Sequence, residues 1–259
     1  ASEPVEGHGA ALPISPTESG RFGIVLLRPS ALVSRETGRS ASFLFMASLL
    51  STLLCVLAGC LLFPTAAGLV AVSLLTLSLL GDMVAVLEEN RDAIWVRREP
   101  PRRANLRLTA KLVSLFLGMF VGFGTMTLLL SEGSIRQGLG EQLGRFAREY
   151  SHLEGVEFGR TRDLIGHNSA VLLACFLFAV IFRAGGALLV LGWNASVWGA
   201  VYGFLIRSQP SGRLYYGVRV AVATLPHVVL EAGGYVLAAL AGIFVSKAMS
   251  KYGPGTPEF

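Results

Sequence analysis

A histidine and a glutamate interrupt a long apolar run near the end of the chain, in the segment LPHVVLEAGG at residues 225–234. His227 and Glu231 are four positions apart, so they share one face of a helix. Such a pair can bind a metal ion, line a path for a solute, or bond to neighbouring helices and fix their packing. A catalytic zinc site needs a third ligand, and the chain has no HExxH motif. We therefore expect neither metal nor cofactor, and an intramembrane metal enzyme is the least favoured interpretation.

Two more charged residues, Asp82 and Arg183, lie inside apolar stretches. A charge at the centre of a bilayer costs at least ~2.5 kcal/mol, so these side chains should face the protein interior and find partners. Counted from the outer ends of the predicted helices, Asp82, Arg183 and Glu231 fall within roughly 6 Å of one level. We predict that Arg183 lies between the two carboxylates and pairs with Glu231. His227 should bond to an amide or a backbone group freed by a helix kink or break at Pro226.

The composition indicates the elements that must position these residues. Of 259 residues, 53% are hydrophobic and only 15% are charged, whereas a soluble domain carries about 25% charged residues. Several apolar runs exceed the roughly 18 to 20 residues that cross a bilayer. The net charge of +5 comes from basic clusters between these runs, which suits anionic lipid headgroups better than nucleic acid. The sequence therefore predicts an all-α, polytopic transmembrane bundle in contact with the lipid bilayer.

The hydropathy pattern divides the chain into tails, an interfacial segment and a transmembrane domain. We expect a disordered tail at 1–20, a cytoplasmic interfacial segment at 21–42, a transmembrane domain at 43–247 and a flexible tail at 248–259. Within the domain, about six apolar stretches are predicted to span the membrane, with the fifth unusually short: 43–63, 66–87, 108–130, 169–191, 194–207 and 219–246.

Arginines set the orientation. The first connection, FPTAAG, has no Lys or Arg, whereas the second carries six arginines between positions 91 and 107, which places it and the N-terminus in the cytoplasm. Asn105 is the predicted cap of the helix that follows. The last connection, RSQPSGRLYYGVR, would lie outside with three arginines, against the same rule. A fifth segment that re-enters instead of crossing is the alternative.

The connection at 131–168 should then be extracytoplasmic. Apolar residues recur in it at helical spacing, which predicts an amphipathic helix packed on its own bundle in preference to one that docks a partner. These residues are Ile135, Leu139, Leu143, Phe146 and Tyr150.

Glycines four residues apart occur twice, as Gly118 with Gly122 and as Gly199 with Gly203. Such pairs let helix backbones approach closely, and we favour packing within the bundle over a dimer interface.

Three segments in order resemble the stage II sporulation protein M family of membrane proteins. GHNSAVLLACFLFAV holds Asn168, GWNASVWGAVYG holds Asn194, Gly199 and Gly203, and LPHVVLEAGGYVLAALAG holds Pro226, His227, Glu231 and Gly242. The resemblance covers roughly residues 105 to 247. The chain departs from the family pattern at His167, Ala195 and Val228, where the family usually has asparagine, glycine and glycine.

The resemblance implies a multi-pass protein of the bacterial inner membrane. In spore formers the family works with cell-wall hydrolases during engulfment, so the expected function is a non-enzymatic scaffold that organises envelope-remodelling partners. Self-association is left open. The alternative is a transporter or channel for a small solute, ion or lipid, which would use Asp82, Arg183, His227 and Glu231 along its path.

Overall fold

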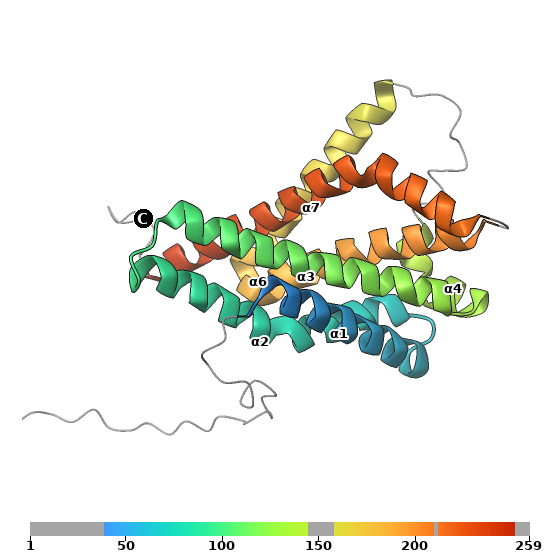
Figure 1. Ribbon diagram of the computed structural model, residues 1–259, viewed down its shortest axis with the longest axis horizontal. Coiled ribbons are helices and arrows are strands. Elements are labelled where there is room, and N and C mark those ends of the chain that lie inside the picture. The colour runs from blue at the N-terminus through green and yellow to red at the C-terminus, as the bar shows by residue number, and fades with distance from the viewer. Residues whose placement is uncertain (1–38, 145–157, 210–211, 252–259) are drawn as a thin grey trace, which may run out of the picture. The chain divides into compact units, whose positions relative to one another are not determined.

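The computed structural model describes residues 39–144, 158–209 and 212–251, and the regular secondary structure of these residues is entirely helical. The predicted N-terminal tail and nearly all of the interfacial segment lie outside this part of the chain. Figure 1 shows the helices in order: α1 (Ala41–Leu62), α2 (Ala67–Trp95), α3 (Pro101–Leu129), α4 (Glu132–Gly138), α6 (Phe158–Arg207) and α7 (Arg213–Lys251).

Local chemistry explains several helix ends. The Ser40 hydroxyl accepts a hydrogen bond from the Phe43 amide at 3.1 Å and caps α1. Pro101 begins α3 directly after Pro100, at a position where a missing backbone N–H carries no penalty. The predicted cap of this helix was wrong, because Asn105 lies a full turn inside α3 and its side-chain oxygen accepts from Asn90.

Five helices in the described part of the chain are long and apolar enough to cross a membrane. They are α1, α2, α3, residues Ile165–Arg207 of α6 and residues Pro226–Lys251 of α7. The prediction of a helical, multi-pass membrane bundle is confirmed at this level. The candidate within α6 has 43 residues, about 64 Å of helix, which is twice the thickness of a bilayer core.

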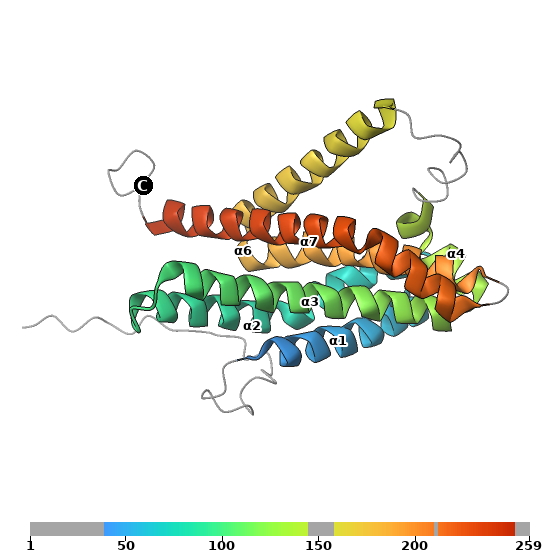
Figure 2. The same ribbon diagram turned by 45° about the horizontal axis from the view of Figure 1, so that its top comes forward.

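Helix α6 reverses direction at Arg183, whose backbone leaves the helical region with φ 54° and ψ −129°. The first arm, residues 158–182, runs in the same direction as α7, because both Asn168–Glu231 and Arg183–Ser246 join positions 63 apart. The second arm, residues 184–207, runs the opposite way, because contacts with α7 move from Thr224 back to Gly217 as α6 advances from Tyr202 to Ile206. Figure 2 shows the two arms, yellow and orange, meeting at the bend.

This bend corrects the predicted spans 169–191 and 194–207. The break lies at Arg183, and Gly192 and Asn194 sit inside the continuous second arm. The segment predicted to be short therefore has 24 helical residues, from 184 to 207. Gly186 makes the bend sterically feasible, since a Cβ there would lie 2.0 Å from the carbonyl oxygen of Phe178.

Glycines allow the helices of the bundle to approach backbone to backbone. A Cβ on Gly118 would lie 2.3 Å from the Phe45 carbonyl oxygen of α1. On the other side of α3, a Cβ on Gly199 would lie 2.5 Å from the Phe120 carbonyl oxygen, and Gly203 makes a similar contact. Both glycine pairs thus pack within this chain, as predicted.

The short helix α4 packs on the bundle. Ile135 and Leu139 are fully buried, and Gly138 lies against Ala67 at the start of α2. The rest of the predicted amphipathic helix, with Phe146 and Tyr150, lies outside the described residues.

Candidate functional site

Glu231 is the centre of a polar cluster formed by α7 and both arms of α6. Its Oε1 accepts a hydrogen bond from Asn168 Nδ2 at 2.5 Å, and His227 Nε2 lies 3.1 Å from the same oxygen. The Glu231 side chain is only 10% exposed, whereas that of His227 is 50% exposed. The second oxygen, Oε2, is buried and has no hydrogen-bond partner among the described residues, although the Trp198 indole faces the same carboxylate. One side of the carboxylate is therefore bonded while the other is not.

Aromatic and hydroxyl side chains of the second arm continue the cluster. The rings of Trp198 and His227 meet edge to face with centroids 5.6 Å apart. One turn further along, the Tyr202 hydroxyl donates to Thr224, and Thr224 donates to the carbonyl oxygen of Val220. Sequence reasoning missed Trp198 because a tryptophan in an apolar span is ordinarily a packing residue.

The predicted ion pair between Arg183 and Glu231 is wrong. Arg183 Nε lies 3.4 Å from Ser246 Oγ, and Glu231 bonds to Asn168, 15 positions earlier on the same arm. Fifteen helical residues correspond to about 22 Å. The error follows from the misplaced break: a span that ended at 191 put Arg183 in the middle of a helix, whereas Arg183 is the turn between two helices.

Asp82 also has a different partner from the predicted one. Its carboxylate pairs with Arg39, just before α1, at 2.5 Å, and both side chains are at least three-quarters buried. Asp82, Arg183 and Glu231 therefore do not meet at one level. The structure brings His227 and Glu231 together and leaves Asp82 and Arg183 outside that cluster.

Pro226 does not break α7. The helix is continuous from Arg213 to Lys251 with Pro226 inside it, and Figure 1 shows it bent along its length. The predicted backbone groups freed by a break are thus not the partners of His227, which pairs with Glu231 one turn away.

The remaining residues of the resemblance have separate positions. Asn194 donates to the carbonyl oxygen of Val190 inside the second arm, so it does not begin a helix. A Cβ on Gly242 would lie 2.4 Å from the Phe176 carbonyl oxygen, so the absence of a side chain at Gly242 lets α7 approach the backbone of the first arm closely. Asn168 and Glu231, from two different segments of the resemblance, are the residues that bond to each other.

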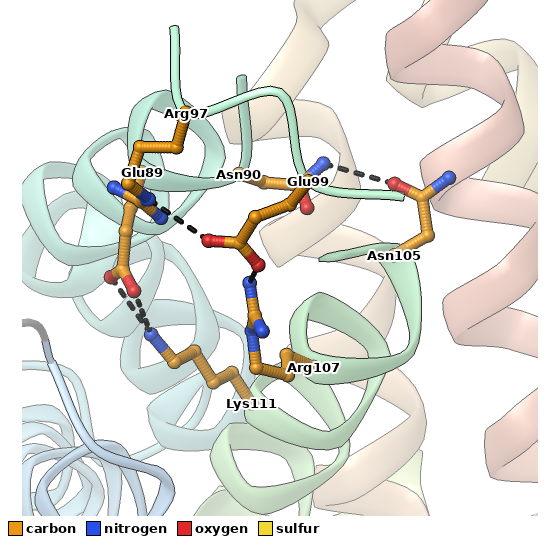
Figure 3. Close-up of polar contacts among 7 residues, drawn as sticks. All are labelled: Glu89, Asn90, Arg97, Glu99, Asn105, Arg107 and Lys111. Atoms are coloured by element: carbon orange, nitrogen blue, oxygen red, sulfur yellow. Dashed lines mark hydrogen bonds and ion pairs between the residues drawn. The ribbon is translucent and has the colours of Figure 1, made fainter. Parts of the chain in front are cut away.

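A second polar network joins the ends of α2 and α3 (Figure 3). Lys111 donates to both oxygens of Glu89 at 2.8 Å, and Asn90 donates to Asn105 at 3.0 Å. The sequence held a signal for it, because Glu89 and Lys111 are each 11 residues from Pro100 and therefore face each other across the helical hairpin.

Glu99 completes this network. It accepts hydrogen bonds from Arg107 and, at 2.9 Å, from Arg97. These bonds, that from Arg107 first, lower the pKa of the Glu99 carboxyl below its ordinary value. The network therefore holds a charged carboxylate between two arginines at the turn.

Arg207 accounts for one arginine of the last connection. Its guanidinium donates to the carbonyl oxygens of Leu128, at 3.2 Å, and Leu130 at the end of α3. These carbonyls have no partner within their own helix, so this arginine has a structural role on whichever side of the membrane it lies.

Among the described residues, no three His, Cys, Asp or Glu side chains come together as potential metal ligands. Comparisons with protein-family models, curated proteins and solved structures find no match for this chain.

Proposed function

We propose that this protein is an integral membrane scaffold whose intramembrane polar residues fix the packing of its helices. The observation that carries the proposal is the bond between Asn168 and Glu231, because it ties the first arm of α6 to α7 where lipid offers no competing partner. The glycine contacts of α3 with α1 and with the second arm of α6 support the same proposal, since they bring helix backbones close together within this chain.

Six crossings with a cytoplasmic N-terminus form part of this proposal. Each arm of α6 has enough residues to cross a bilayer once. The arginine-rich hairpin between α2 and α3 lies at the same end of the bundle as the end of α7, because Lys251 stacks on Trp95. Both would then lie in the cytoplasm, and the bacterial inner membrane is the proposed location.

The resemblance to the stage II sporulation protein M family suggests the class of partner. Asn168 and Glu231 come from separate segments of the resemblance and contact each other, which supplies a physical reason for that combination of residues. We infer that the bundle anchors cell-envelope proteins, with peptidoglycan-remodelling enzymes as the first candidates.

A membrane cross-linking experiment tests the scaffold. Full-length tagged protein would be cross-linked in its native membrane and searched for peptidoglycan-active enzymes, with Asn168→Ala as the packing variant and Ser169→Ala, an exposed neighbour, as the matched control. We expect such enzymes with wild type and the control and fewer with Asn168→Ala. Their absence from all three samples would refute the scaffold.

Transport is the second candidate, and one observation favours it. Glu231 Oε2 is buried without a hydrogen-bond partner among the described residues, beside a half-exposed histidine. A carboxylate so placed can take up a proton or a cation. Proton or sodium flux into proteoliposomes that is lost in Glu231→Gln would establish this function in place of the scaffold.

A further inference from the structure

Two residues other than glycine have positive φ in the described part of the chain, and both are arginines. Arg98 has φ 55° and Arg183 has φ 54°. This backbone conformation is unfavourable for a residue with a Cβ and is readily adopted by glycine. Gly185 and Gly186 follow Arg183 directly, yet the strained position itself holds arginine. Strain of this kind points to a use for the side chain.

The side chain of Arg183 lies in a group of cations drawn from three helices. It contacts Ser246 of α7 at 3.4 Å, and the next residue, Lys247, interacts electrostatically with Arg183, with Arg91 of α2 and with Glu88. All four charged residues are exposed.

Positive charge is in excess at this place. Arg91 is already paired with Asp92 through two hydrogen bonds. Among the described residues, no carboxylate lies within 4.0 Å of the charged nitrogens of Arg183 or Lys247. The Arg183 guanidinium thus reaches Ser246, the residue next to Lys247, and both cations have donors available to an external anion.

The depth of the group indicates the source of that anion. Lys247 is 16 residues from Glu231 along α7, about 24 Å, and Arg91 follows 24 residues of α2, about 36 Å of helix. A bilayer core is about 30 Å thick. These lengths place the cations toward the end of the bundle that carries the arginine-rich hairpin, which the proposed topology puts at the level of the cytoplasmic lipid headgroups.

We propose that Arg183 and Lys247 bind the phosphate group of an anionic lipid headgroup. A guanidinium offers paired donors to phosphate oxygens and an ammonium adds a point charge. A basic pocket between transmembrane helices at the cytoplasmic surface is the setting in which such headgroups bind. The bound phosphate would join the bend of α6 to α7.

Thermal unfolding in neutral detergent tests this site, with added phosphatidylglycerol, phosphatidylcholine or inorganic phosphate as probes. Saturating phosphatidylglycerol should raise the Tm of wild type by about 5 to 10 °C, and phosphatidylcholine should not. Arg183→Gly should keep or raise the Tm without lipid, because glycine relieves the strain, and should lose most of the lipid-dependent rise.

Arg98→Gly is the matched control, because it relieves the same type of strain and removes the same charge at another turn. Arg98→Gly should retain the lipid-dependent rise in Tm. Lys247→Gln should lose most of that rise, and this second variant keeps the test decisive if Arg183→Gly fails to fold. The site is refuted if Lys247→Gln retains the full rise or if Arg98→Gly loses as much as Arg183→Gly. A rise with inorganic phosphate equal to that with phosphatidylglycerol would overturn the lipid assignment.

Discussion

Asn168 donates a hydrogen bond to Glu231 over 2.5 Å, at the same 63-residue offset at which Arg183 reaches Ser246. The first arm of α6 and α7 therefore run side by side in one direction, with a polar contact toward each end. An amide is bonded to a carboxylate at one end, and a guanidinium lies beside a hydroxyl at the other.

Removing the Asn168 amide should destabilise the protein, because the buried carboxylate would lose its shortest bond. We expect Asn168→Ala to lower the free energy of unfolding by about 1 to 2 kcal/mol, measured by thermal unfolding in detergent. In the Asn168→Ala/Glu231→Gln double variant the loss should be smaller than the sum of the two single losses. Additive losses would show that the two side chains do not interact.

Arg183 and Glu231 should behave as independent sites. Asn168, the partner of Glu231, lies about 22 Å from Arg183 along the first arm, so the losses in Arg183→Ala and Glu231→Ala should add to within about 0.5 kcal/mol in the double variant. If the double variant instead recovered part of the lost stability, that result would support the ion pair between Arg183 and Glu231 that the sequence predicts. The same unfolding assay measures both outcomes.

Gly199 should not tolerate a larger side chain. A Cβ there would lie 2.5 Å from the Phe120 carbonyl oxygen and 2.8 Å from the Phe123 side chain, so Gly199→Val should destabilise the bundle by about 1 to 3 kcal/mol. Gly233→Ala is the control, since nothing lies within 4 Å of its Cβ position. It should be neutral or stabilising, and equal losses in both variants would contradict the described packing of α3 on α6.

The turn between α2 and α3 should lose stability in acid. The Glu99 pKa is lowered by Arg107 and Arg97, so its contribution is fully present above the ordinary pKa of 4.5 and is lost as the pH falls through the lowered value. Glu99→Gln should have a slightly lower Tm than wild type at pH 7, and the two Tm values should converge as the pH falls through the lowered pKa of Glu99. Because Glu99 is solvent-accessible, 1 M salt should shrink the difference. A gap that does not shrink at all as the pH is lowered would exclude the ion pairs as its cause.

Reporter fusions test the six-crossing topology. A reporter after Arg98 should respond from the cytoplasm, and reporters near Glu149 and within 209–213 should respond from outside. Because the first arm begins and the second arm ends at the same end of the bundle, a cytoplasmic response at 209–213 with an outside response near Glu149 would contradict the antiparallel arms of α6.

The approximate positions of α1, α2 and α3 and the span in α7 could be predicted from the sequence. The hydrocarbon core of a bilayer admits only long apolar helices, and apolar runs of that length are easily recognised in a sequence. The packing role of the glycine pairs could also be predicted, since two glycines one helical turn apart allow close helix packing in most contexts. His227 and Glu231 were recognisable as one site from their spacing alone.

The bend at Arg183 and the partner of Glu231 depended on tertiary structure. Hydropathy is similar on both sides of residues 183–186 and around Gly192, so local sequence offered two places for the reversal. Packing distinguishes them: Gly186 lies against the Phe178 carbonyl of the opposing arm, whereas Gly192 faces Val72 and Met119 across the bundle. A shift of the bend by eight residues moves every contact of the arm by about 12 Å, and that register decides that Glu231 bonds to an amide and not to an arginine.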